Sequence, residues 1–276
     1  MAGGPHTAFE RGERIGCNSL QIFVKSPNRW QGAKLKERDV ESFHAARAAA
    51  PQPVIAHAAY LINLAGNTPE LLEKSRKGLA DELERCQLLG VDALVVHPGA
   101  HMGAGEEEGI DVIARSLDAV LAPLAHVDTR LLLENTAGQG TTLGFEFEQL
   151  SAIIERSEHS DRLGVCLDTC HAFAAGYGLR EEGEWRELLE RLDATVGLAR
   201  VHALHLNDSK HPQGSRRDRH ESIGEGHIGD EAFARIVAEP AFASLPMILE
   251  TPLGDDEKGH ERDLARLRSL VGRTTG

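Results

Sequence analysis

Short apolar runs recur along the chain, and stretches of helical periodicity separate them. The runs lack the alternation of polar and apolar positions that marks a half-buried strand, which indicates strands of a parallel sheet covered on both faces. The predicted strands are residues 19–24, 54–57, 93–97, 131–134, 165–168, 203–206 and 247–250.

Between these runs, apolar residues recur at the spacing of an amphipathic helix. The clearest start is Thr68-Pro69-Glu70, which offers an N-cap, a proline at the first helical position and an acid in the first turn. The predicted helices are residues 40–50, 69–89, 110–125, 148–156, 184–196, 231–238 and 262–271, and residues 7–14 are helix-like.

Alternating strands and helices predict an α/β fold with a parallel sheet. A (β/α)8 TIM barrel formed by residues 1–276 as a single domain fits the length of 276 residues best. A doubly wound open sheet is the structural alternative, but it usually carries a glycine-rich phosphate turn after an early strand, and the sequence has none.

One strand is missing from a complete barrel, because the sequence offers seven strand runs. The chain opens with Met1-Ala2-Gly3-Gly4-Pro5, a turn that leads directly into the helix-like residues 7–14. Without a first strand, two edges of the sheet would stay unpaired. We therefore expect that the first strand is absent from this chain and that an extension of about ten residues before Met1, sized to one strand, would improve solubility and activity.

Polar residues of the kinds that bind metals stand at the carboxyl ends of six predicted strands. In a parallel barrel these ends meet on one face, where active sites form. Each residue alone has an ordinary structural explanation, but burying several carboxylates and imidazoles together is unfavourable without a cation. The six are His57, His97, Glu134, Asp168, His205 and Glu250, and His171 follows Asp168 closely.

Imidazoles mixed with carboxylates favour Zn²⁺, with Mn²⁺ or Fe²⁺ possible, over sites built from oxygen alone. Cys166 and Cys170 flank Asp168, and on an extended strand all three side chains would share a face. We interpret both cysteines as buried packing residues. Several histidines together with carboxylates that can bridge two ions are typical of a hydrolytic centre with several metal ions.

The composition of the chain limits which partners it could bind and in which cellular compartment it could act. The net charge of −13 argues against binding nucleic acid through a generally basic surface. Four scattered cysteines suggest reduced thiols. The sequence shows neither a membrane-spanning apolar run nor a signal peptide, so we expect a cytoplasmic protein without a membrane partner.

Longer motifs now identify a family. The chain resembles deoxyribonuclease IV, the endonuclease IV family of zinc-dependent abasic-site endonucleases, from about Ala2 to Leu270. The motifs are AHAAYLINL (56–64), VHPGAH (96–101), LENTAGQG (133–140), GVCLDTCHAFAAGY (164–177), HLNDSK (205–210), DRHESIGEG (218–226) and LETP (249–252).

The resemblance implies a monomeric DNA-repair hydrolase of base excision repair. It would act on double-stranded DNA, hydrolysing the phosphodiester bond 5′ to an abasic site and leaving a 3′-hydroxyl. Glu134 and Glu250 would be catalytic, with Glu134 orienting the water. Three zinc ions, for which Mn²⁺ could substitute, would be held by three ligand sets: His57, His97 and Glu134; Glu134, Asp168, His205 and Glu250; His171, Asp218 and His220.

The resemblance also implies contacts with DNA. Tyr60 and Leu61 match a pair that enters the minor groove, although Leu61 could instead pack under a loop. Asn28 stands where the family usually has an inserting arginine, with Arg29 beside it, and Gly178 replaces a common aspartate. Three Zn²⁺ would add +6 and bring the charge from −13 to −7, and few basic contacts predict a shallow salt dependence.

Two other functions compete. A sugar or sugar-phosphate isomerase places a similar metal set in a related barrel, but it has no use for the additional ligands His171, Asp218 and His220. A non-catalytic binder of damaged DNA or a metal-holding protein belongs to a different class. The complete set of nine ligands argues against loss of catalysis, and turnover on an abasic duplex would distinguish the two.

Overall fold

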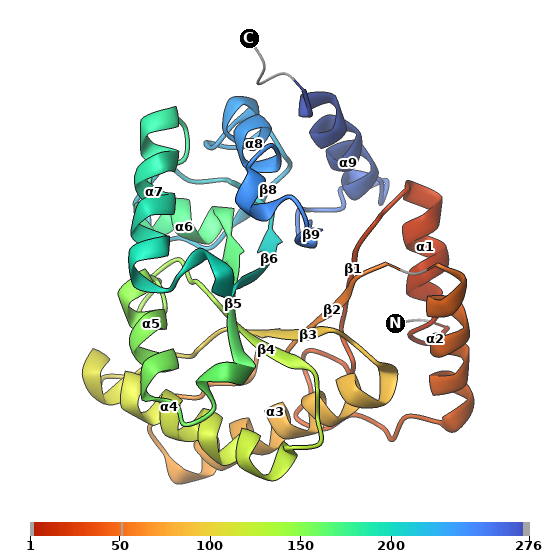
Figure 1. Ribbon diagram of the computed structural model, residues 1–276, viewed down its shortest axis with the longest axis vertical. Coiled ribbons are helices and arrows are strands. Elements are labelled where there is room, and N and C mark those ends of the chain that lie inside the picture. Colours follow the sequence, from red (N-terminus) through yellow and green to blue (C-terminus); the bar gives the residue numbers. More distant parts are fainter. Residues whose placement is uncertain (1–2, 51, 273–276) are drawn as a thin grey trace. The chain divides into compact units, whose positions relative to one another are not determined.

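The computed structural model describes residues 3–50 and 52–272. The chain divides into two compact units, residues 1–134 with 149–164 and residues 135–148 with 165–276. In both, parallel strands alternate with helices, as predicted (Figure 1). No helix in the described residues has the length and apolar character needed to cross a bilayer.

The first unit is built on four parallel strands in the order β1-β2-β3-β4, which pair in register from Leu20 opposite Val54 onward. Strands β2 and β3 are buried at every position, as the absence of alternation predicts. The elements are α1 (Thr7–Ile15), β1 (Leu20–Ile22), α2 (Glu37–Ala49), β2 (Val54–His57), α3 (Pro69–Leu89), β3 (Ala93–Val96), α4 (Glu106–Leu121), η1 (Ala122–Leu124), β4 (Arg130–Glu134), most of α5 (Phe147–Arg156) and η2 (Ser160–Arg162).

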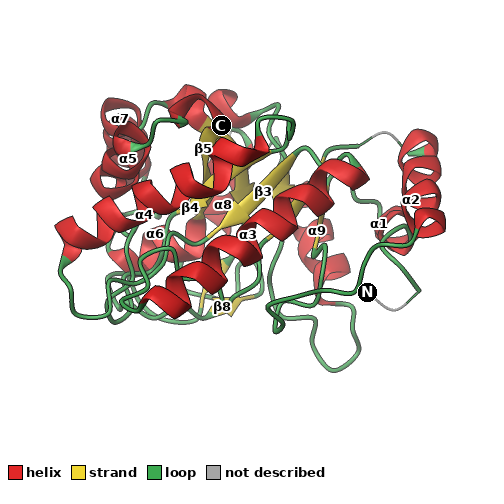
Figure 2. Ribbon diagram, turned by 90° about the horizontal axis from the view of Figure 1, so that it is seen from below, coloured by secondary structure: helices red, strands yellow, loops and turns green. Residues whose placement is uncertain are grey.

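Helix pairs cover these strands. Helices α1 and α2 pack through the edge-to-face rings of Phe9 and Phe43, whose centroids are 5.1 Å apart. Helices α3 and α4 run side by side (Figure 2). The N-terminus of α3 matches the prediction, because the Thr68 hydroxyl accepts a hydrogen bond from the Leu71 backbone N at 3.3 Å and Pro69 is the first helical residue.

The second unit contains three parallel strands in the order β5-β6-β9 and an antiparallel hairpin, β7-β8. Helices α8 and α9 lie side by side and are joined by the ion pair between Arg266 and Asp230 (Figure 1). The elements are β5 (Leu163–Asp168), α6 (Thr169–Ala175), α7 (Glu182–Thr195), η3 (Leu198–Arg200), β6 (Val201–His205), β7 (Asp208–Ser209), β8 (His220–Glu221), α8 (Asp230–Val237), η4 (Pro240–Phe242), β9 (Met247–Ile248) and α9 (Gly259–Leu270).

The structure confirms that β5 ends at Asp168 but corrects the expectation that Cys170 shares its strand face. The strand does not continue through Cys170, because helix α6 begins at Thr169 and the Asp168 carboxylate caps it by accepting the His171 backbone N–H at 2.7 Å. Cys170 therefore lies on a helix and does not share a strand face with Asp168, whereas Cys166, two residues before Asp168 on β5, does. The last strand is also shorter than predicted, so Glu250 lies two residues beyond β9.

Gly178 has a local explanation. A Cβ at this position would lie 2.6–2.7 Å from side-chain atoms of Glu184. That carboxylate accepts hydrogen bonds from the backbone N atoms of Arg180 and Glu181 and so caps helix α7. Glycine here leaves room for the cap.

Two predictions about chain organisation stay predictions. In residues 3–50 the first strand is β1, which follows helix α1, as the sequence indicates. Met1 and Ala2, where the proposed missing strand would join, lie outside the described residues. The single domain of residues 1–276 is likewise a prediction.

Candidate metal centre

In the first unit, three predicted ligands meet at the ends of neighbouring strands. His57 ends β2, His97 directly follows β3 and Glu134 ends β4. The Nε2 atoms of His57 and His97 each lie 3.0 Å from Glu134 Oε2, and one ligand atom from each residue falls within 4.8 Å of the others. Glu134 is fully buried, whereas the His97 side chain is 35% exposed, so the set is closed on one side and reachable on the other.

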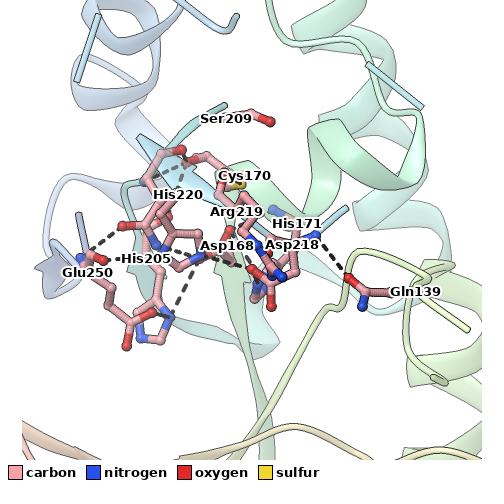
Figure 3. Close-up of polar contacts among 12 residues, drawn as sticks. Gln139, Asp168, Cys170, His171, His205, Ser209, Asp218, Arg219, His220 and Glu250 are labelled. Carbon is pink, nitrogen blue, oxygen red and sulfur yellow. Dashed lines mark hydrogen bonds and ion pairs between the residues drawn. The ribbon is translucent and has the colours of Figure 1, made fainter. Parts of the chain in front are cut away.

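In the second unit, six predicted ligands come from five places in the fold, and one of them, Glu250, lies two residues beyond β9. Asp168 ends β5, His205 ends β6, His171 lies on α6, and Asp218 and His220 belong to the segment around β8. His205 Nδ1 lies 3.2 Å from Glu250 Oε2 and 3.8 Å from Asp168 Oδ2. Figure 3 shows His205 beside Glu250, and His171, Asp218 and His220 gathered around Asp168.

Three of the histidines share one hydrogen-bonding pattern. The Nδ1 atom of each contacts a backbone carbonyl: His57 with Ala58 O at 2.7 Å, His171 with Asn135 O at 2.9 Å and His220 with Glu250 O at 3.2 Å. Because a carbonyl can only accept, Nδ1 carries the proton. In the neutral ring Nε2 then presents its lone pair, which is the form that binds metal and the usual way a protein orients a ligating histidine.

The Nε2 lone pairs point at carboxylate oxygens. Both are hydrogen-bond acceptors, so neither can satisfy the other. His171 Nε2 lies 3.2 Å and His220 Nε2 3.5 Å from Asp218 Oδ1. His220 Nε2 is also 3.9 Å from Asp168 Oδ2, yet it is buried and has no hydrogen-bond partner among the described residues. A cation between these atoms would satisfy all of them, and the nitrogen and oxygen donors suit zinc. The residues therefore fit the metal that the resemblance implies.

Two buried asparagines position these ligands, and the sequence pattern did not single them out. Asn207 donates from Nδ2 to Asp168 Oδ2 at 2.7 Å and accepts the Glu250 backbone N–H at 2.8 Å. The Asn135 side chain exchanges two hydrogen bonds with the Asp168 backbone, at 2.7 and 3.0 Å. The signal that could have identified them is an asparagine one or two residues after a predicted strand-end ligand. Such a position is expected to be buried, and a buried amide must be hydrogen-bonded.

Asp208 organises the segment that follows His220. Its fully buried carboxylate accepts hydrogen bonds at 2.7–3.3 Å from the backbone N atoms of Ser209, Gly224, Gly226, Ile228 and Gly229. The segment comes so close that a Cβ at Gly226 would be 2.4 Å from Asp208 Oδ1. Burial raises the pKa of this carboxyl group, although the backbone hydrogen bonds lower it.

Cys170 lies near Asp168 and His220 but is a poor ligand. Burial, and then the charge of Asp168, raises the pKa of its thiol to about 12. The group therefore stays protonated at neutral pH, and the thiolate is the form that binds metal. Cys166 is fully buried as well, and both are free thiols, in line with their interpretation as packing residues.

The residues expected to contact DNA are accessible. The Tyr60 side chain is 61% exposed, and its ring centroid lies 5.7 Å from those of Phe23 and His57. Leu61 is half-buried and Arg29 is exposed, on the segment that follows β1. Tyr60 is therefore beside one of the predicted metal ligands.

A basic segment lies next to the predicted metal ligands of the second unit. Lys210, Arg216, Arg217 and Arg219 are exposed and flank Asp218. The pKa of His211 is lowered, first by partial desolvation and then by the charges of Arg217 and Lys210. This acidic chain thus carries a local positive segment where an anionic substrate could be held.

Known proteins resemble this chain over nearly its whole length. The model of the xylose isomerase-like TIM barrel family matches residues 9–270. Proteins described as probable endonuclease 4 from Chloroflexus aggregans and from Nitratidesulfovibrio vulgaris (strain DP4) are each 47% identical over 272 residues, covering 98% and 99% of this chain and 95% and 96% of theirs. The crystal structure of endonuclease IV from Thermus thermophilus has a TM-score of 0.83 at 40% identity, covering 96% of this chain and 93% of that one.

A D-tagatose 3-epimerase-like protein, with a TM-score of 0.73 at 20% identity, shares the fold alone. The matches confirm the prediction of a TIM barrel of the α/β class and of a nuclease. This chain belongs to the endonuclease IV family of nucleases, within the xylose isomerase-like TIM barrels.

Proposed function

We propose that this protein is a DNA-repair endonuclease that hydrolyses the phosphodiester bond 5′ to an abasic site in double-stranded DNA and leaves a 3′-hydroxyl. Three zinc ions would be held by the nine ligands that the resemblance implies, and Mn²⁺ could substitute. We further propose that the protein acts in the cytoplasm as a monomer with a single domain, residues 1–276.

One observation carries the proposal: the Nε2 atoms of His171 and His220 both face Asp218 while their Nδ1 atoms are bound to backbone carbonyls. This additional ligand set has no use in a two-metal isomerase. It supports a phosphodiesterase, in which several cations neutralise a phosphate and the oxygen that leaves it.

The roles of the carboxylates follow from burial and contact. When bound, zinc supplies Lewis-acid activation of water and phosphate. Glu134, fully buried and shared by the His57 and His97 side chains, would orient the attacking water and accept its proton through a carboxylate oxygen. Glu250 would be the second catalytic carboxylate, and its side chain is 21% exposed and paired with His205.

Lesion recognition would use exposed side chains at the first unit's strand ends. Tyr60 and Leu61 would enter the minor groove when the abasic nucleotide is flipped out, and Arg29 would contact the duplex beside them. The basic segment around Asp218 would hold the phosphate backbone, which gives an acidic protein a few contacts of the right sign.

The function is tested with an end-labelled duplex that contains one abasic site. The zinc-loaded protein should make a single nick 5′ to the lesion, and a polymerase should extend the new 3′ end. A chelator should stop the reaction, and Zn²⁺ or Mn²⁺ should restore it. The proposal fails if the loaded protein leaves the duplex intact or cuts undamaged duplex equally well.

Removing one ligand of the third set should remove one metal ion. We expect His220→Ala to lower the zinc content from about three ions per chain to about two, because the other sets keep all their ligands. Elemental analysis of the purified protein measures this. His44→Ala, at an exposed histidine outside the sets, is the control and should keep about three. A wild type with one ion or none in active form would contradict the prediction.

Tyr60→Ala should weaken binding to an abasic duplex by about 1–3 kcal/mol, or roughly 5- to 150-fold, which is the usual contribution of aromatic stacking on nucleic acid. Zinc content and melting temperature should not change, because the side chain is 61% exposed. Fluorescence anisotropy with labelled duplex measures the affinity. The control is Leu88→Ala, which truncates an exposed apolar side chain on α3. Equal losses of affinity in both variants would show that Tyr60 has no special role in binding.

A further inference from the structure

A buried ion pair joins two segments of the first unit that carry the proposed DNA contacts. Lys25, just after β1, is 6% exposed, and Glu82, in the middle of α3, is 1% exposed. Lys25 Nζ lies 3.1 Å from Glu82 Oε1, and it donates to Trp30 O at 2.9 Å and to Gly78 O at 3.2 Å. All three protons of the ammonium group can therefore be used, although none of these contacts involves a metal ligand.

The same pair also reaches the segment that follows β2. Glu82 Oε1 accepts a hydrogen bond from the Ala59 backbone N at 3.1 Å, and Ala59 directly precedes Tyr60. The hydrogen bond from Lys25 to Trp30 O, in turn, fixes the backbone directly after Arg29. One ion pair thus holds the backbone next to both Arg29 and Tyr60.

Helix α3 also binds the backbone at the other end of the segment that carries Arg29, through Arg85. Arg85 donates to Gly32 O at 3.1 Å and to Ala33 O at 2.9 Å, and its Nε donates to Asp81 at 2.9 Å. Gly32 is closely packed between these side chains, because a Cβ there would lie 2.8 Å from Lys25 Cβ and 3.1 Å from Arg85 Cζ. Residues 25–33 are therefore tied to α3 at both ends, and Asn28 and Arg29 project from between the ties.

We propose that Lys25 and Glu82 form a positioning pair that holds the segments bearing Arg29 and Tyr60 in the geometry that binds abasic DNA. The inference rests on the proposed function. A buried ion pair contributes little net stability compared with well-packed apolar residues, so stability does not account for its presence here. Its hydrogen bonds go to the backbone of the two segments, and holding a binding segment in its bound conformation reduces the entropy lost on association.

The test replaces both charges together. In Lys25→Met/Glu82→Leu the side chains keep similar volumes, and Asp81, 3.6 Å from Lys25 Nζ, keeps its ion pair with Arg85, so no unpaired charge remains. The protein should therefore fold, but the two segments lose their hydrogen bonds to the pair. We expect affinity for an abasic duplex to fall at least tenfold, with zinc content unchanged and turnover at saturating duplex within twofold of wild type. Leu83→Ala is the matched control on the same helix: it removes a fully buried leucine, lowers the melting temperature and should leave affinity within twofold.

Two further measurements keep the inference testable. Gly32→Ala forces a Cβ between Lys25 and Arg85 without removing any charge, and it should also lower the affinity for an abasic duplex. It replaces the double variant as the test if the double variant does not fold. In a Trp185→Phe background, Trp30 is the single tryptophan, and its emission should shift to the red in the pair variant but not in Leu83→Ala. That readout needs no DNA, so it tests the pair even if the wild type were not to nick abasic DNA.

The inference is overturned if the pair variant keeps wild-type affinity and Trp30 emission, or if Leu83→Ala loses as much affinity as the pair variant does. A wild type that neither binds nor nicks abasic duplex would instead refute the proposed function. The two failures are therefore distinguishable.

Discussion

Glu134→Gln should lower the rate of cleavage at an abasic site by about a thousandfold, within the range for a positioned acid–base group. Glutamine keeps the shape of the side chain but removes the anionic oxygen that lies 3.0 Å from both His57 Nε2 and His97 Nε2. Metal affinity should fall with it, because the neutral amide is a weaker ligand for zinc than a carboxylate. Single-turnover cleavage of the labelled duplex and elemental analysis measure the two effects.

The stability of this variant separates chemistry from unfolding. Glu134 is fully buried, so removing its charge also removes a desolvation penalty. The metal-free variant should therefore unfold at no lower urea concentration than metal-free wild type. Glu73→Gln makes the same chemical change at an exposed position of α3 and should leave rate and zinc unchanged. A Glu134→Gln protein that keeps more than a tenth of the wild-type rate would remove Glu134 from the catalytic role.

Asp208→Ala should lower the free energy of unfolding by about 4 kcal/mol, because five backbone N–H groups, two buried and three partly buried, lose their acceptor, and each hydrogen bond contributes roughly 0.5–1.5 kcal/mol. The loss should extend to the metal centre, since these groups shape the segment that follows His220. Urea denaturation measures the first effect, and zinc content, expected to fall by about one ion, measures the second.

The matched comparison for Asp208 is Asp230, whose side chain is 38% exposed and pairs with Arg266. Asp230→Ala should cost less than about 1 kcal/mol, because an exposed ion pair contributes little. Asp208→Asn keeps one acceptor oxygen and should fall between wild type and alanine. Equal stabilities for Asp208→Ala and Asp230→Ala would show that the backbone hydrogen bonds are replaced by water at no cost.

Local pattern was enough to predict the strands and the candidate ligands that cluster at their ends. A strand covered on both faces must be apolar, so a histidine or an acid at its last position stands out, as at His57, Glu134 and Asp168. Because parallel strands of a barrel end on one face, the order of the strands already groups such residues. The N-cap of α3 at Thr68 is local in the same way, because the capping hydroxyl and the N–H it accepts are three residues apart.

The hydrogen-bond partners of the site were decided by tertiary structure. Asp168 is both the end of β5, as predicted, and the cap of α6. The pattern of Cys166, Asp168 and Cys170 also fits an extended strand, so the sequence did not show that Cys170 lies on a helix. Asn207, Asp208 and the pair of Lys25 with Glu82 read as ordinary polar residues, because their role depends on partners brought close by the fold. Periodicity reports which face of an element is buried, whereas the satisfaction of a buried polar group is set by residues distant in the chain.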